Sequence, residues 1–185
     1  GNATPKFFGG LNQQFSWKNF DMSIFMNFVL GNDILNANKL EFSSGYTPNS
    51  NLLAIMNDRF TNVNSAGQVV TDPNELAALN ADAKIWTPLT SASSFYMHSW
   101  AIEDGSFLRI NNITLGYTLP TSMLQAFKIQ RFRVYATGNN LGIFTNYTGY
   151  DPEVNTRRRT PMTPGVDYSA YPRARTFIAG VNITF

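Results

Sequence analysis

The stretch Thr176-Phe-Ile-Ala-Gly-Val-Asn-Ile-Thr-Phe185 alternates between two kinds of side chain and stops on an aromatic residue. Every second residue from Phe177 to Phe185 is apolar, and those between are mostly polar or small. A period of two predicts a β-strand, and ten residues are about the length that a tilted strand needs to cross a hydrocarbon core of ~30 Å. The pattern is typical of a transmembrane barrel strand, although an amphipathic strand that closes a soluble sandwich would look the same.

The composition of the 185 residues departs from that of an ordinary soluble domain. Charged residues make up 14% and hydrophobic residues 43%, whereas a soluble domain carries about 25% charged residues. So few charges make a poor soluble surface and favour strands that face lipid. The net charge of +2 does not support a nucleic-acid partner, and the absence of cysteine excludes disulfides and thiolate chemistry.

Strand periodicity recurs along the chain and predicts an all-β fold with five antiparallel strands, at about residues 6–17, 20–30, 107–119, 131–139 and 176–185. The first two predict a hairpin, because only two residues separate them. Trp17 and Phe20 flank that turn and suit the aromatic girdle of a membrane barrel. Arg109 and Asn111 fall on the apolar face of the third strand, which must therefore leave the hydrocarbon there or carry a β-bulge.

Short and long connections alternate along the chain. Residues 31–106 and 140–172 form long, polar connections, whereas those at residues 18–19 and 120–130 are short. Outer-membrane barrels sort their connections in this way, with short periplasmic turns and long external loops. A soluble sandwich has no reason to do so, and the pattern therefore predicts two external loops.

The first long loop is predicted to contain two short helices. One covers residues 51–60. The other begins at a capping box formed by Asp72 and Glu75, with Pro73 at the first helical position. The alternative is a small helical subdomain of a soluble protein.

Five strands cannot close a barrel, because bacterial examples have even numbers of at least ~8. We therefore expect the chain to be part of something larger. No apolar run approaches the ~18 residues of a membrane helix. The first residues lack the basic and apolar segments of a signal peptide, so we expect a mature chain or a fragment.

Few residues suggest a chemical site. His98 is the single histidine and is interpreted as a loop residue, so no metal site, bound cofactor or catalytic set is expected, and the chain is not expected to be an enzyme. Glu103 and Asp104 are interpreted as an anchor that leads into the third strand. Asp151 and Glu153 are interpreted as a structural staple within the second long loop.

Two groups are candidates for contact with a ligand or a partner. Tyr96 and Trp100 belong to an aromatic cluster before the third strand. Aromatic rings stack on sugars, so a glycan contact is one interpretation and an anchor at the membrane interface is the other. Arg157, Arg158 and Arg159 form a charge run that is either a solvated loop face or a site for an acidic lid protein or lipopolysaccharide phosphate.

Four stretches of the chain carry a resemblance to one protein family. They are Glu103-Asp-Gly-Ser-Phe-Leu-Arg-Ile-Asn-Asn-Ile-Thr-Leu-Gly-Tyr-Thr-Leu-Pro120, then residues 133–141, 145–154 and 171–177. In this order they closely resemble hallmarks of the SusC/RagA class of TonB-dependent outer-membrane transporters. Residues 5–11 and 17–20 are similar to an earlier hairpin of that class, whereas residues 31–100 match poorly.

The resemblance implies that the chain supplies the last five strands of a barrel of about 22 strands with an N-terminal plug, in the outer membrane of a diderm bacterium. Its implied partners are a SusD-like surface lipoprotein that lids the barrel, the TonB complex that supplies energy, the barrel assembly machinery and outer-membrane lipid. The implied cargo is an oligosaccharide or a peptide. Gly180, Ile183 and Phe185 would belong to the signal that the assembly machinery recognises.

Other protein classes stay open on the residues alone. They are a soluble β-rich carbohydrate-binding or adhesion domain, a plain porin and an outer-membrane barrel enzyme. The missing catalytic set disfavours the enzyme, and the long structured loops disfavour the porin. The sequence does not distinguish a glycan from a peptide as cargo.

Overall fold

The computed structural model describes residues 1–44, 49–87, 97–153 and 164–185. The chain divides into two compact units, one formed by Gly1–Leu35 together with Ile102–Phe185 and the other by Asn36–Ala101. Within the described residues, no helix is both long enough and apolar enough to cross a membrane.

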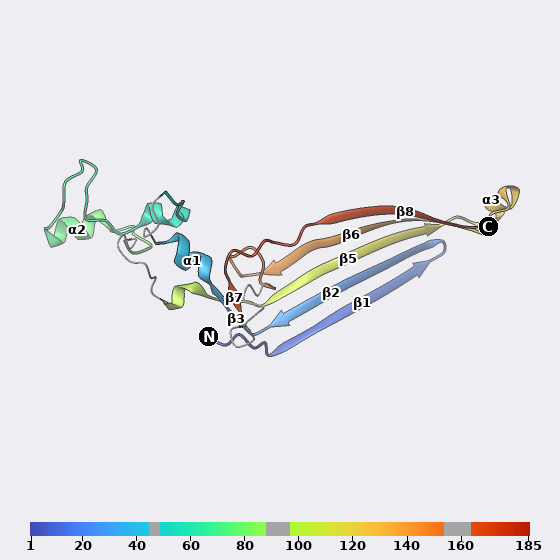
Figure 1. Cartoon of the computed structure of the whole chain (residues 1–185), viewed down its shortest axis with the longest axis horizontal. Helices are drawn as coiled ribbons and strands as arrows, with labels where there is room; N and C mark the ends of the chain where they lie inside the picture. Colours follow the sequence, from blue (N-terminus) through green and yellow to red (C-terminus); the bar gives the residue numbers. More distant parts are fainter. Residues whose placement is uncertain (45–48, 88–96, 154–163) are drawn as a thin grey trace. The chain divides into compact units, whose positions relative to one another are not determined.

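The first unit is built on a five-stranded antiparallel sheet, whose strands are drawn side by side in Figure 1. Its strands are β1 (Phe7–Trp17), β2 (Phe20–Leu30), β5 (Phe107–Thr118), β6 (Arg131–Thr145) and β8 (Thr176–Thr184). They lie in the order β1-β2-β5-β6-β8, so every neighbour in the sheet is also the next of these strands along the chain. The predicted antiparallel all-β fold is confirmed, but β6 runs to Thr145 rather than ending at residue 139.

A bulge in the two central strands decides which way Arg109 faces. In β5, the pairing with β2 skips Asn111, which is the extra residue. β6 carries a matching irregularity near Asn140, whose φ of 51° is left-handed, and it continues beyond this point. The bulge shifts the alternation by one residue, so Arg109 lies opposite Asn27 on the polar face. Of the two alternatives that the sequence left open, the bulge is the one adopted.

Cross-strand pairing places most of the large apolar residues of the five strands on one face of the main sheet, although Phe8, Phe25, Val29 and Ile178 lie on the other face and Gln13 lies on the apolar one. Its large side chains are extensively exposed within this unit: Phe7, Trp17, Leu115 and Phe177 are each more than half exposed. Such a face is unfavourable in water and needs an apolar environment. We call it the apolar face, and it comprises Phe7, Leu11, Phe15, Trp17, Phe20, Met22, Ile24, Met26, Phe28, Leu30, Leu108, Ile110, Ile113, Leu115, Tyr117, Phe132, Val134, Ala136, Phe144, Phe177, Ala179, Val181 and Ile183.

The opposite, polar face carries side chains that bond with one another across the strands. The hydroxyl oxygens of Thr114 and Thr137 lie 2.8 Å apart. The side-chain amide of Asn111 donates to Oδ1 of Asn27 at 2.6 Å. These polar groups therefore satisfy part of their hydrogen-bonding capacity within the sheet.

On the polar face, an ion pair crosses the central strand β5 at a glycine. Nε and Nη2 of Arg133 on β6 lie 3.0 and 2.5 Å from the two carboxylate oxygens of Asp21 on β2. β5 runs between these two strands, and a Cβ at its Gly116 would overlap both the guanidinium and the carboxylate. The bidentate pair forms because Gly116 leaves this space empty.

Short connections lie at one end of the main sheet and long ones at the other (Figure 1). At the short-turn end, Lys18 and Asn19 join β1 to β2, and α3 (Thr121–Leu124) with η3 (Gln125–Phe127) joins β5 to β6. At the opposite end, β3 (Asp33–Asn36), β4 (Ile102–Asp104) and β7 (Val166–Asp167) form a second sheet in the order β4-β3-β7. The predicted sorting of connections by length is confirmed.

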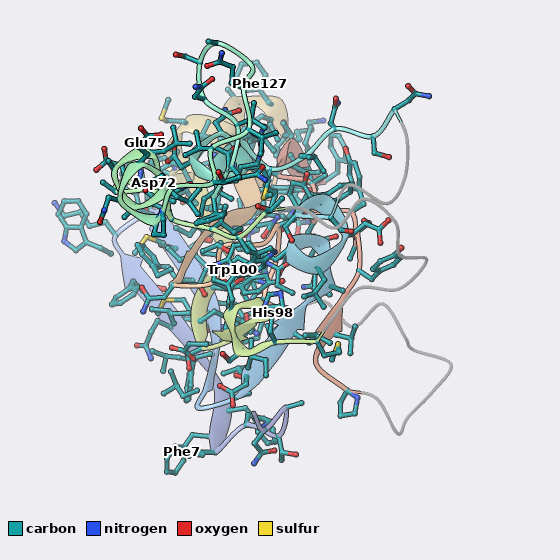
Figure 2. The ribbon with its side chains drawn as sticks, turned by 90° about the vertical axis from the view of Figure 1, so that its left-hand side faces the viewer. Phe7, Asp72, Glu75, His98, Trp100 and Phe127 are labelled. Carbon is teal, nitrogen blue, oxygen red and sulfur yellow. The ribbon has the colours of Figure 1, made fainter. Side chains whose placement is uncertain are left out.

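The second unit consists of short helices: α1 (Ala37–Phe42), η1 (Ala54–Asp58), α2 (Pro73–Leu79) and η2 (Ser99–Ala101). α2 begins at the predicted cap, because Oδ1 of Asp72 accepts hydrogen bonds from the backbone N–H of Asn74 at 2.9 Å and of Glu75 at 3.0 Å. Figure 2 labels Asp72 and Glu75 at this turn. The helix expected over residues 51–60 is wrong in length, since only the 3-10 turn η1 forms where no side chain caps its start.

Gly116→Ala, made in the complete protein that contains this sequence, is expected to lower the stability of the folded sheet by about 1–3 kcal/mol. The reason is that the added Cβ displaces the Asp21–Arg133 pair. The temperature at which the folded band is lost in semi-native electrophoresis measures the effect. Gly142→Ala is the control, because a Cβ there meets no atom within 4 Å. Equal unfolding temperatures for the two variants would contradict the tight crossing at Gly116.

Candidate functional site: loop anchors and an aromatic cluster

Residues 103–106, just before β5, are hydrogen-bonded to the end of β6 and to the residues that follow it. Glu103 accepts hydrogen bonds from the backbone N–H of Thr148 at 2.8 Å and from its hydroxyl at 2.9 Å. Asp104 accepts from the N–H of Ser106 at 2.9 Å, and the carbonyl oxygen of Ser106 accepts from the hydroxyl of Thr145 at 2.8 Å. The predicted anchoring role of Glu103 and Asp104 is confirmed.

Arg109 is the centre of a buried ion network, here called the Arg109 network, with Asn140, Asp151, Glu153 and Arg173. Its side chain is only 2% exposed. The guanidinium pairs with the carboxylate of Asp151, and its Nε lies 3.1 Å from Oε2 of Glu153. It also donates to Oδ1 of Asn140 at 2.7 Å. Burial of a guanidinium is costly unless it is paired in this way.

The Arg109 network fixes both ends of the second long connection. Asp151 and Glu153 follow β6, whereas Arg173 precedes β8 and lies 3.3 Å from the other oxygen of Glu153. The amide of Asn140 donates to the backbone carbonyl of Arg173 at 2.7 Å. The predicted staple role of Asp151 and Glu153 is confirmed. The periodicity gave no sign of their partner Arg109, because the bulge at Asn111 was needed to turn it toward them.

A second buried contact holds β7 to the segment after β6. The hydroxyl of Tyr147 donates to Oδ2 of Asp167 at 2.6 Å, and both side chains are buried. Burial, followed by the hydrogen bond to Asp167, raises the pKa of Tyr147 above its usual value. The phenol therefore stays protonated and keeps donating this hydrogen bond.

In the second unit, Trp86, His98 and Trp100 form an aromatic cluster; Figure 2 labels the neighbouring His98 and Trp100. The ring of Trp86 lies edge-on to His98 at 4.4 Å and to Trp100 at 5.3 Å between centroids. Nζ of Lys39 lies 4.7 Å from the centroid of Trp100. Burial lowers the pKa of His98, so the imidazole is neutral near pH 7.

The aromatic cluster shows that Trp86 is a better candidate for ligand contact than Trp100. Trp100 is partly covered by its neighbours, whereas Trp86, which the sequence pattern did not single out, is 40% exposed. Tyr96 lies outside the described residues, as do Arg157, Arg158 and Arg159. Their roles stay predictions.

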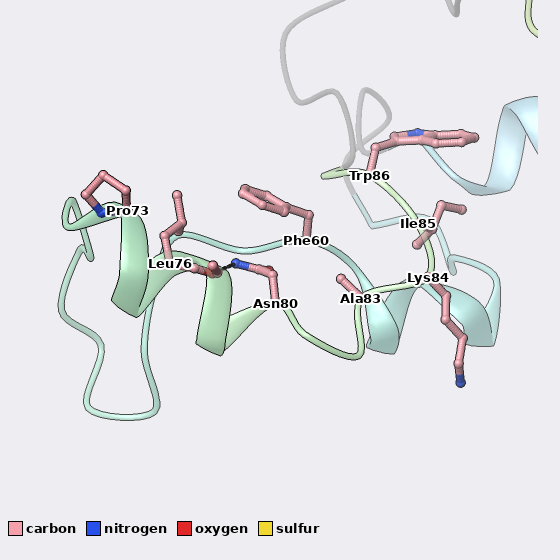
Figure 3. A pocket seen from close by; sticks show the side chains of 9 residues that line it. Phe60, Pro73, Leu76, Asn80, Ala83, Lys84, Ile85 and Trp86 are labelled. Carbon is pink, nitrogen blue, oxygen red and sulfur yellow. Dashed lines mark hydrogen bonds between the residues drawn. The ribbon is translucent and has the colours of Figure 1, made fainter.

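A shallow hollow of about 640 Å³ lies beside Trp86 in the same unit (Figure 3). Its lining is mainly apolar and includes Phe60, Leu76 and Ile85. The one amide in the lining, Asn80, donates to the carbonyl of Leu76 at 2.9 Å, and this bond is drawn in Figure 3. Because that amide is occupied within the unit, the hollow offers mostly hydrophobic contact to any group that enters it.

The candidate assembly residues lie along or just after β8. Gly180 is opposite Tyr135 of β6, and a Cβ at Gly180 would overlap the phenol ring. Ile183 pairs with Phe132 on the apolar face and is 47% exposed. Phe185 follows β8 and is 78% exposed. Gly180 thus has a packing role within the sheet, and the assembly role of all three residues stays a prediction.

Among the described residues, no group of three His, Asp or Glu side chains could hold a metal ion. The buried carboxylates Asp151 and Asp167 are instead bonded to Arg109 and Tyr147. The polar groups at the end of the main sheet therefore have structural partners, and their arrangement fastens loops.

No family model matches the chain. Relatives of known class do: TonB-dependent receptor P3 of Formosa agariphila is 34% identical over 189 residues and covers the whole chain. TonB-dependent receptor SusC of Bacteroides thetaiotaomicron is 32% identical over 177 residues, or 95% of the chain. The chain spans only 17% and 15% of the lengths of these two relatives.

Solved structures share the fold at low sequence identity. The RagAB peptide importer in its closed-closed state matches 99% of the chain with a TM-score of 0.73 at 23% identity, and the chain covers 18% of that structure. The open-open state of the same importer gives a TM-score of 0.70 at 22% identity. The fold therefore defines the chain as a portion of a transmembrane β-barrel. Given its relatives P3 and SusC, the chain belongs to the SusC/RagA family of TonB-dependent receptors.

Arg109→Gln in the complete protein is expected to destabilise the loop ends by about 3–5 kcal/mol, because Asp151 and Glu153 lose their buried partner. Faster proteolytic cleavage between residues 146 and 175 on intact cells measures this. Arg173→Gln is the control, since its side chain is 52% exposed and such a pair contributes about 0–1 kcal/mol. Equal cleavage rates for the Arg109 variant and the unmodified protein would refute the anchoring role.

Proposed function

We propose that the chain forms part of the wall and mouth of an outer-membrane active importer. The observation that carries the proposal is the two-faced main sheet, with an apolar face built from all five strands and a polar face bonded within itself. Hydrocarbon suits the first face, and a water-filled or plugged lumen suits the second. Membership of a receptor family supports the import role.

The strands have a proposed place within the complete barrel. β1, β2, β5, β6 and β8 are the last five of about 22 strands, and the connections at residues 31–106 and 146–175 face the cell exterior. The apolar face argues against a soluble carbohydrate-binding or adhesion domain. Many of its aromatic side chains are more than half exposed, and in a soluble domain these surfaces would meet water. The anchored long connections argue against a plain porin and a barrel enzyme, since their buried polar groups fasten loops.

The proposed mechanism is import under a lid. A SusD-like lipoprotein closes over the mouth, cargo binds between the two proteins, and TonB displaces the plug to let the cargo pass. The cargo is an oligosaccharide or a peptide; the structurally similar RagAB is a peptide importer. The proposed contacts with cargo or lid are Trp100, Tyr96 and Trp86, the last being the more exposed ring beside Trp100. A second proposed contact is the charge run Arg157, Arg158 and Arg159, which would meet an acidic lid or lipopolysaccharide phosphate.

The assembly machinery is proposed to recognise β8 through Gly180, Ile183 and Phe185. Phe185→Ser in the complete protein is expected to reduce its amount in the outer membrane, measured by immunoblots of membrane fractions. Phe177→Ser is a matched control, because Phe177 has nearly the same exposure as Phe185, 76% against 78%, but lies near the start of β8, whereas Phe185 follows its end. Equal amounts of the two variants would remove the special role of Phe185.

The mouth role of the second unit is tested by replacing residues 37–100 with a four-residue turn. A short turn suffices, because Leu35 and Ile102 pair directly across β3 and β4. We expect a normal amount of barrel in the outer membrane, with weaker co-purification of the lipoprotein or slower uptake of labelled oligosaccharide or peptide. Loss of the barrel itself would contradict the loop assignment. Unchanged lid contact and uptake would contradict the mouth role.

A further inference from the structure

A groove of about 550 Å³ lies on the apolar face near the short-turn end of the main sheet. Ala136 of β6 and Ala179 of β8, which pair with each other, are its small residues. Larger side chains flank them, among them Leu115, Tyr117 and Val181. The small residues leave a dip among large apolar neighbours, and an extended hydrocarbon chain is the kind of group that fills such a space.

Aromatic side chains continue from this groove to the β1–β2 turn. The rings of Tyr117 and Phe20, both in the groove lining, have centroids 4.6 Å apart, and those of Phe20 and Trp17 are stacked at 6.5 Å. Nζ of Lys18 lies 5.0 Å from the Trp17 ring. Rings with a cation at their outer end are suited to the boundary between hydrocarbon and water. One row of contacts thus leads from the groove to a cation.

The neighbouring β5–β6 connection carries a second cation beside exposed apolar groups. Phe127 is 72% exposed and Met123 is 60% exposed. Lys128 follows directly and ends η3 in a left-handed conformation with φ of 56°. The connection therefore repeats the combination found at the β1–β2 turn, an exposed aromatic ring followed at once by a lysine.

The short-turn end of the main sheet carries more positive than negative charge. Residues 118–132 contain no Asp or Glu, and neither do residues 176–185. Asp21, the carboxylate nearest the β1–β2 turn in sequence, is held by Arg133 on the polar face. Arg131 lies on the polar face too, opposite Thr184. Among the described residues, no carboxylate forms an ion pair with Lys18 or Lys128.

We propose that the short-turn end binds an anionic phospholipid, with an acyl chain in the groove and the phosphate at Lys18 and Lys128. This inference rests on the proposed placement of the sheet in a membrane. A phospholipid supplies in one molecule the hydrocarbon for the groove and the negative charge for the lysines. A free phosphate would leave the groove and the exposed Trp17 and Phe127 uncovered, and an acidic peptide would bring its charges against them.

The test uses the complete protein, freed of other cysteines, in phosphatidylcholine bilayers with a fluorophore on Met123→Cys. Phosphatidylglycerol or phosphatidylcholine carrying a quenching label on its acyl chain is then added in increasing amounts. We expect phosphatidylglycerol to quench at a lower mole fraction than phosphatidylcholine, and the difference to shrink in high salt. Equal quenching by the two lipids would overturn the proposal.

Substitutions separate the charge from the groove. Lys18→Gln and Lys128→Gln are each expected to lower the preference for phosphatidylglycerol by up to roughly fivefold. Lys84→Gln, which removes an exposed lysine of the second unit, is the control and leaves the preference unchanged. Ala136→Phe fills the groove and weakens quenching by both lipids. A preference that survives loss of both lysines would contradict the proposed phosphate contact.

The outcomes also separate this inference from the proposed function. A protein that does not insert into phosphatidylcholine bilayers shows no quenching by either lipid, and then the membrane placement itself has failed. A protein that inserts but shows no preference refutes only the lipid site. Stronger binding of an acidic peptide than of phosphatidylglycerol at the same fluorophore would assign the surface to a protein partner instead.

Discussion

The rest of this structure depends on one constraint: side chains must alternate between two faces while the backbone of each strand stays hydrogen-bonded to its neighbours. Hydrocarbon supplies no partners for backbone groups, so every strand in it must be paired on both edges and must send its polar side chains to one side. β2, β5 and β6 are paired on both edges within the chain. Their register sets which residues share the apolar face. The bulge at Asn111 and the missing side chain at Gly116 keep charged groups on the opposite face.

Much of the fold could be predicted from the sequence, because a period of two is a local property that survives without knowledge of the partners. The five strands follow from this period. The sorting of connections follows from their lengths, and the cap at Asp72 follows from a local capping box. The Arg109 network was not, since Arg109 meets Asp151 across 42 residues of sequence only after the bulge shifts its face. The full length of β6 could not be predicted for a similar reason. Asn140 is a residue typical of loops, but here its left-handed φ belongs to a bulge in the β5–β6 pairing, after which the strand continues.

The residues that carry the family resemblance are largely those that fasten the connections. Glu103, Asp104, Ser106 and Arg109 come from one such stretch, and their bonds reach Thr148, Thr145 and Asp151 in another. The second unit, which matched the family poorly, enters and leaves at the paired Leu35 and Ile102. Because the two ends of the inserted segment are held by this pairing, its sequence can differ without disturbing the paired strands.

The most direct measurement is a scan of spin labels on single cysteines along β2, from Met22 to Asn27, in the complete protein in bilayers. Assignment of the apolar face to lipid predicts high accessibility to oxygen at Met22, Ile24 and Met26 and low accessibility at the residues between them. Uniform accessibility along the strand, or the opposite alternation, would contradict it.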